Sequence, residues 1–192
     1  MKNSILLIGP LASGKSTIAL KLSEIIEVNN YPVDRLKWYY RFNNGYNLSI
    51  GTNLLKNKGF EYLIEYANSF FGIAELKTIL SQFSGVIDFG AIDTYCDNIV
   101  KYNELKSVFE NYPNSFLILP TPNVETNISI LSERLIKRYE YHAFKKEIVE
   151  SYIEMNNVIL RTQFLYKIAK HTIYIEEKDI YDLCREIISK LQ

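Results

Sequence analysis

Residues 9–16 constrain the fold more than any other stretch of the chain. They read Gly-Pro-Leu-Ala-Ser-Gly-Lys-Ser, the GxxxxGK[ST] spacing of a phosphate-binding loop. An apolar run over 4–8 precedes the motif and is short enough for a buried strand. Apolar residues at helical spacing follow it, namely Ile18, Leu22, Ile25 and Ile26. The motif therefore predicts a strand, a tight turn and a helix, in that order.

The chemistry of the motif follows from its backbone. Gly9 and Gly14 permit a turn in which several backbone N–H groups point inward together. A helix that begins near Lys15 adds about half a positive charge at its N-terminus. Lys15 would reach the β- and γ-phosphates of a nucleotide, and the Ser16 hydroxyl would take one position on Mg²⁺. The predicted nucleotide-binding residues are Gly9, Pro10, Leu11, Ala12, Ser13, Gly14, Lys15, Ser16 and Thr17; the alternative is a chance glycine-rich turn before an ordinary helix.

The amino-acid composition of the chain limits which partners it can be expected to bind. A chain of 192 residues suits one α/β domain over 1–192. Because 22 basic residues balance 22 acidic ones, we expect no nucleic acid and no membrane surface as partner. The apolar start is too short for a signal peptide or a membrane span, and Cys96 and Cys184 form no metal or disulfide pattern, so we expect a cytoplasmic protein. Oligomeric state cannot be read from the sequence.

Two carboxylates follow predicted strands. Residues 31–34 read as a short second strand that ends in Asp34, where a general base would be useful at the carboxyl edge of an α/β sheet. The alternative is that Asp34 caps a helix over 36–40. Residues 85–88 read as a further strand that ends in Asp88, the arrangement in which Walker-B carboxylates hold Mg²⁺. Gly90 after it would allow close approach of a phosphate or an acceptor, or it is a plain turn residue.

Two further regions suggest substrate contacts. The stretch 41–58 is rich in Asn, Gly and aromatic residues without clear periodicity, which indicates a loop or short helices over a pocket; we expect an acceptor-binding region at about 36–75. A helix from residue 123 carries Arg134 and Arg138 opposite its apolar side, and they are candidates for a closing lid at about 134–152. The alternative is a solvated basic face. Strands are expected at 115–119 and 171–175, with helices over 156–169 and 180–191.

The order of these motifs resembles shikimate-kinase-like P-loop kinases along nearly the whole chain. The matching stretches are the P-loop, the strand with Asp34, Val-Ile-Asp-Phe-Gly at 86–90, Leu-Pro-Thr-Pro at 119–122, Leu-Ser-Glu-Arg-Leu at 131–135 and Ala-Lys-His-Thr-Ile-Tyr at 169–174. The resemblance implies a three-layer α/β fold with a five-stranded parallel sheet in order 2-3-1-4-5, helices on both faces and a lid. It also implies transfer of the γ-phosphoryl group of ATP to a small hydroxyl acceptor with Mg²⁺. Asp34 then matches the carboxylate that orients the acceptor hydroxyl, and Asp88 the acidic position before the glycine turn.

The chain departs from shikimate kinases at the acceptor site. Glu61 follows Phe60 where those enzymes carry a substrate-binding arginine, and Phe-Gly-Ala at 89–91 replaces a run of glycines. We therefore expect a small-molecule kinase that is not shikimate kinase itself, with a nucleoside, a nucleotide or another hydroxylated metabolite as acceptor. The alternative is a nucleotide-binding regulatory module without acceptor chemistry. The sequence does not decide whether the phosphoryl donor is ATP or GTP, or whether the base is Asp34 or Asp88. It also leaves open whether Arg134 or Arg138 is the lid arginine.

Overall fold

The computed structural model describes residues 4–95, 99–141 and 146–192. By its internal contacts the chain divides into two compact units: residues 1–32 with 84–192, and residues 33–83. Among the helices that the structure describes, none combines the length and the apolar character needed to cross a membrane. Cys184 is buried as a free thiol, and burial raises its pKa; Cys96 lies outside the described residues.

The first unit is built on a five-stranded parallel sheet in the order β2-β3-β1-β4-β5. Its strands are β1 (Ile5–Ile8), β2 (Asn30–Pro32), β3 (Val86–Asp88), β4 (Ser115–Leu119) and β5 (His171–Tyr174). β1 lies at the centre, where Leu7 is opposite Asp88 on β3 and Phe116 on β4. The expected sheet order is confirmed. Since all strands run the same way, the loops that follow them meet at one edge of the sheet.

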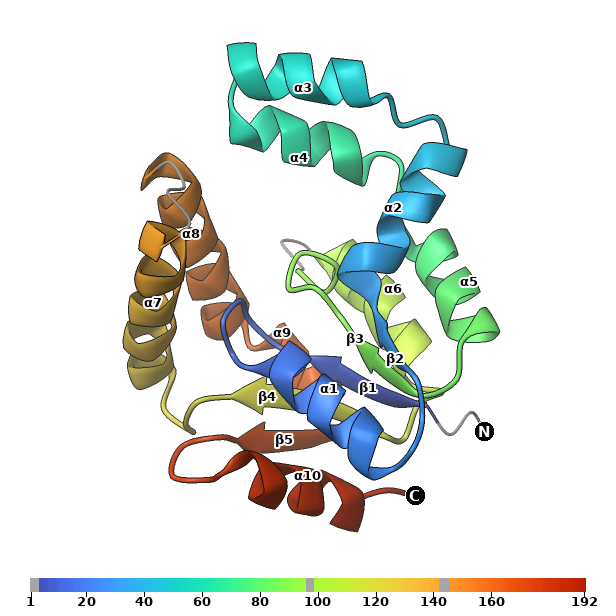
Figure 1. Cartoon of the computed structure of the whole chain (residues 1–192), viewed down its shortest axis with the longest axis vertical. Coiled ribbons are helices and arrows are strands. Elements are labelled where there is room, and N and C mark those ends of the chain that lie inside the picture. The colour runs from blue at the N-terminus through green and yellow to red at the C-terminus, as the bar shows by residue number, and fades with distance from the viewer. Residues whose placement is uncertain (1–3, 96–98, 142–145) are drawn as a thin grey trace. The chain divides into compact units, whose positions relative to one another are not determined.

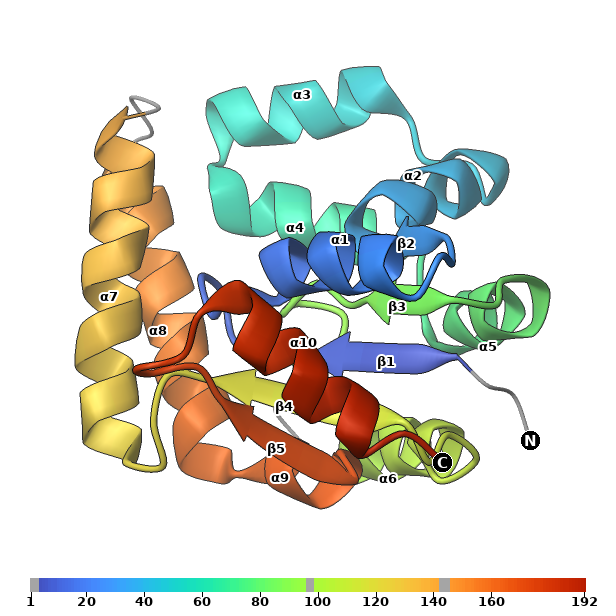
Figure 2. The same ribbon diagram turned by 60° about the horizontal axis from the view of Figure 1, so that its bottom comes forward.

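The sheet is covered on both faces, which explains why its central strands are apolar throughout. Helices α1 (Lys15–Ile25) and α10 (Ile180–Ser189) pack on one face, and α6 (Ile99–Phe109) and α9 (Phe164–Ile168) lie on the other (Figures 1 and 2). The core under α1 and α10 includes Leu7, Ile18, Phe116, Ile173 and Ile187. Every residue of β1 and β4 is buried, so the loop after β1 starts from a fixed point.

Two long helices form a pair beside the sheet, α7 (Val124–Tyr141) and α8 (Lys146–Thr162). The helix expected over 156–169 therefore begins earlier, and it is interrupted at Gln163, whose φ of 54° is left-handed. After Gln163 the chain continues as the short α9. The expected lid at 134–152 falls on the ends of α7 and α8, except that residues 142–145, with His142 among them, lie outside the described residues.

The second unit contains only helices, namely α2 (Val33–Asn43), α3 (Leu48–Asn57), α4 (Phe60–Asn68) and α5 (Ile73–Gln82). The stretch 41–58 thus folds as the end of one helix, a turn and a short helix, one of the two outcomes expected for it. An aromatic cluster holds this unit together around Tyr46, whose ring centroid lies 5.3–5.9 Å from those of its neighbours Trp38, Phe42, Tyr66 and Phe70.

Candidate phosphate-binding site

The loop over residues 9–14 joins β1 to α1 and depends on residues with positive φ. Gly9, Ala12 and Gly14 have φ of 147°, 62° and 92°. At Gly9 an added Cβ would lie 2.6 Å from the carbonyl oxygen of Ile118 on β4. The backbone at Gly9 therefore approaches the neighbouring strand more closely than any side chain allows, and the glycine predicted from the motif is required there.

Helix α1 presents an open N-terminus at the end of this loop. Its N-cap is Gly14, which offers no side chain to cap the helix, and the first turn carries no acidic residue. Ser16 and Thr17 of that turn are exposed. Orphan N–H groups and the positive end of the helix dipole therefore remain available to an anion, as at the phosphate sites of other P-loops.

Lys15 folds back over the loop. Its side chain is buried, with 7% of the residue exposed, and Nζ donates hydrogen bonds to the Pro10 carbonyl oxygen at 2.7 Å and to Ser13 Oγ at 3.4 Å. The ammonium group thus sits against the loop that a phosphate would occupy. Phosphate oxygens are charged acceptors and form stronger hydrogen bonds than a neutral carbonyl or hydroxyl, so they would compete well for this ammonium.

Asp88 lies beside the loop at the end of β3. Only 5% of it is exposed, and it is opposite Leu7 of β1, two residues before Gly9. The described residues contain no group of three or more His, Cys, Asp or Glu side chains that could hold a metal ion. Mg²⁺ in phosphoryl-transfer sites binds one or two carboxylates and completes its shell with substrate phosphates and water. Asp88 and the exposed Ser16 fit that pattern.

The turn after Asp88 is closed by a side chain that sequence reasoning did not single out. Phe89 N–H donates to the Leu7 carbonyl oxygen at 3.0 Å, which continues the sheet, and Gly90 N–H donates to Asp93 Oδ2 at 3.1 Å. The Gly90 N–H group is therefore used within its own turn. This arrangement supports the turn interpretation of Gly90 that the sequence left open.

Helices α7 and α8 both contact the phosphate loop. Arg134 of α7 donates from Nη1 to the Ala12 carbonyl oxygen at 3.3 Å. Arg138, one turn later, has its guanidinium 5.9 Å from the centre of the Tyr139 ring. Of the two arginines that the sequence offered, Arg134 is the one with a described contact to the loop.

Asn156 of α8 was missed by sequence reasoning. Its Oδ1 accepts from Leu11 N–H at 2.8 Å and its Nδ2 donates to the Leu11 carbonyl oxygen at 3.1 Å. The sign in the sequence was an asparagine spaced seven residues after Val149 and three before Ile159, which puts all three on the buried side of α8. A sequence cannot show which partner such a residue meets 145 positions away.

Asp34 belongs to the second unit. β2 ends at Pro32 and α2 begins at Val33, so Asp34 lies in the first turn of α2, not at the end of a strand as the sequence predicted. Pro32 has no backbone N–H group with which to continue the ladder to β3, so β2 ends there and α2 begins. Asp34 pairs with Lys37 one turn later. A carboxylate at this position also complements the helix dipole.

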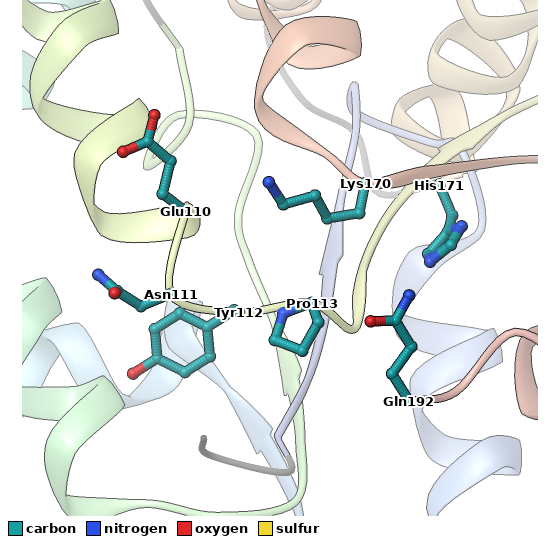
Figure 3. A pocket seen from close by; sticks show the side chains of 7 residues that line it. All are labelled: Glu110, Asn111, Tyr112, Pro113, Lys170, His171 and Gln192. Carbon is teal, nitrogen blue, oxygen red and sulfur yellow. The ribbon is translucent and has the colours of Figure 1, made fainter.

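A separate hollow lies at the other edge of the sheet, where β4 and β5 begin (Figure 3). It has a volume of about 730 Å³ and is lined by Glu110, Tyr112, Lys170 and His171 among others. Burial lowers the pKa of His171, and the positive charge of Lys190 lowers it further. The hollow does not belong to the phosphate-binding site, because the P-loop follows the carboxyl end of β1.

Comparisons with known proteins agree with this fold. No protein-family model matches the chain, and no curated protein matches its sequence. Solved structures do match, including a shikimate kinase from Acinetobacter baumannii in complex with shikimate (16% identity, TM-score 0.61, covering 98% of this chain and 92% of that one). Others are shikimate kinases from Bacteroides thetaiotaomicron (17%, TM-score 0.56, 97% and 96%) and Aquifex aeolicus (20%, TM-score 0.54, 98% and 95%).

These matches define the class of the fold. The chain has the three-layer P-loop kinase fold, and the likeness to shikimate kinases that the sequence indicated is confirmed at that level. At this identity the likeness concerns the fold alone. Glu61, which the motif resemblance set at the position of the substrate-binding arginine of shikimate kinases, is an exposed residue in the first turn of α4.

Proposed function

We propose that this protein is an ATP-dependent phosphotransferase that moves the γ-phosphoryl group to a hydroxyl group of a small molecule. The observation that carries the proposal is the junction of β1 and α1, where a glycine-dependent loop, an uncapped helix N-terminus and the buried Lys15 ammonium come together. Such a junction neutralises a compact, highly charged group. The kinase fold of its structural neighbours supports the same activity.

The proposed roles follow from charge. Residues 9–17 would hold the triphosphate, and Lys15 and Arg134 would neutralise the charge that spreads over the transferred group. Ser16 and Asp88 would hold Mg²⁺, which offsets the charge of the β- and γ-phosphates when bound. In the transfer, the acceptor oxygen forms a bond to the γ-phosphorus while the bond to the ADP oxygen breaks. The hydroxyl proton passes to a carboxylate, for which we propose Asp34.

The rest of the chain would serve the acceptor. We propose that residues 1–192 work as one kinase-like domain in the cytoplasm, with an acceptor-binding region at about 36–75 and a lid at about 134–152. The Asn- and aromatic-rich stretch 41–58 favours an acceptor with hydrogen-bonding groups and a ring, such as a nucleoside.

The test is a screen of hydroxylated metabolites and nucleosides for acceptor-dependent release of ADP. The Lys15→Ala variant serves as the negative control, because it removes the central cation of the loop. We expect at least one compound class to raise ADP release in wild type and not in the variant. Saturable ATP binding without stimulation by any compound would instead favour a nucleotide-binding regulatory module.

A further inference from the structure

The contact between Asn156 and Leu11 ties a distant helix to the phosphate loop. Leu11 is the third residue of the motif, and both of its backbone polar groups are engaged by one side chain, at 2.8 Å and 3.1 Å. An N–H group can only donate and a carbonyl can only accept, so the amide of Asn156 has one orientation that satisfies both. The peptide groups on either side of Leu11 are thereby fixed.

Burial makes this contact difficult to exchange for water. Only 2% of Asn156 is exposed, and apolar residues of α8, among them Ile159 and Leu160, are buried near it along the helix. A buried amide without partners is costly, and so is an unpaired buried N–H. The pair therefore favours one conformation of the loop. The next residue, Ala12, has a φ of 62°, which L-residues rarely adopt, and such a conformation persists only where its surroundings hold it.

Helix α8 is itself held in place against α7. Arg161 forms a two-pronged ion pair with Glu125 near one end of the two helices, with N–O distances of 2.9 Å and 3.1 Å. Near the other end, the rings of Tyr139 and Tyr152 lie 5.5 Å apart. Asn156 lies between these two contacts on α8. Asn156 therefore bonds to the loop from a helix that is itself packed against α7, and the two helices lie side by side in Figures 1 and 2.

We infer that Asn156 is a positioning residue that holds the phosphate loop in its binding conformation before nucleotide arrives. The inference rests on the proposed function, because it assigns a role in the same nucleotide site. A loop that is ordered in advance loses less conformational entropy on binding, so the affinity for the triphosphate is higher. Asn156 acts through Leu11 and contributes no contact of its own to the reacting atoms.

The test compares three variants by titration calorimetry with Mg·ATP. Asn156→Leu keeps the approximate size and removes both hydrogen bonds, and Asn156→Asp keeps the acceptor but removes the donor and adds a negative charge. Asn157→Leu is the neighbouring control, since Asn157 Nδ2 donates to Glu154 of its own helix at 3.4 Å. We expect Asn156→Leu to weaken ATP binding about tenfold, which corresponds to about 1.4 kcal/mol, and Asn157→Leu to leave it near wild type.

Hydrogen exchange reports on the loop itself: the Leu11 amide should be protected in wild type without nucleotide and exchange faster in both Asn156 variants. If Asn156→Leu lowers the melting temperature but binds ATP as tightly as Asn157→Leu, the inference is overturned. If wild type binds no ATP, the proposed function itself fails.

Discussion

Replacing Gly9 by alanine tests whether the loop is fixed by contact with the sheet. The added methyl group would lie 2.6 Å from the Ile118 carbonyl oxygen and 3.3 Å from Ser13 Oγ. A carbon and an oxygen atom normally stay about 3.3 Å apart or more, so either the loop or β4 must move. Overpacking of this kind costs about 1–3 kcal/mol. The φ of 147° adds about 1–3 kcal/mol of backbone strain for a residue with a side chain.

Together these terms predict a loss of about 4 kcal/mol in the free energy of unfolding. With an m value of about 2 kcal/mol/M, the urea midpoint should fall by about 2 M. The matched control is Gly14→Ala, at a φ of 92° with the nearest other atom, Ile175 Cδ1, at an ordinary 3.7 Å. It carries only the strain of the left-handed region, about 1–2 kcal/mol. Equal midpoints for the two variants would refute the close approach of Gly9 to β4.

Three further changes separate the proposed roles. Asp34→Asn should lower turnover about 10²- to 10⁴-fold and leave ATP affinity unchanged, since the amide keeps the size but not the basicity; unchanged turnover would exclude Asp34 as the base. Arg134→Ala should lower turnover by roughly 10³-fold, while the turnover of Arg138→Ala stays near that of wild type. The opposite result would assign the lid role to Arg138 and not to Arg134. The folded-state pKa of His171 is lowered, so the unfolded chain binds more protons there. The stability from His171 is therefore complete above about pH 6.5 and is lost as the pH falls toward the folded pKa. Urea midpoints measured from about pH 7 to pH 5 should fall less in His171→Gln than in wild type.

The phosphate loop could be predicted because its determinants are local. The spacing of Gly9, Gly14 and Lys15 encodes the turn, and the apolar runs on either side encode the strand and the helix. The sheet order came from the resemblance of the whole motif series to a known kinase family. Short apolar runs give the strands but not their neighbours, because pairing between parallel strands depends on distant parts of the chain.

The features that the sequence did not predict depend on contacts between distant residues or on the exact ends of helices and strands. The bond between Asn156 and Leu11 spans 145 residues, and an asparagine in a helix carries no local sign of such a partner. Asp34 was placed on a strand because Tyr-Pro-Val-Asp suits either an extended segment or the start of a helix. The break at Gln163 escaped notice because its left-handed φ occurs in a residue type that gives no turn signal.

The most direct test of the account is a calorimetric titration of Mg·ATP into wild type and into Lys15→Ala. We predict saturable binding at one site in wild type and loss of most of the affinity in the variant. At ATP concentrations about a hundredfold above Kd, binding should stabilise wild type by about 2.7 kcal/mol, which raises its melting temperature by roughly 5–10 °C. Absence of binding by folded wild type at millimolar ATP and GTP would contradict the assignment of the β1–α1 junction as a nucleotide site.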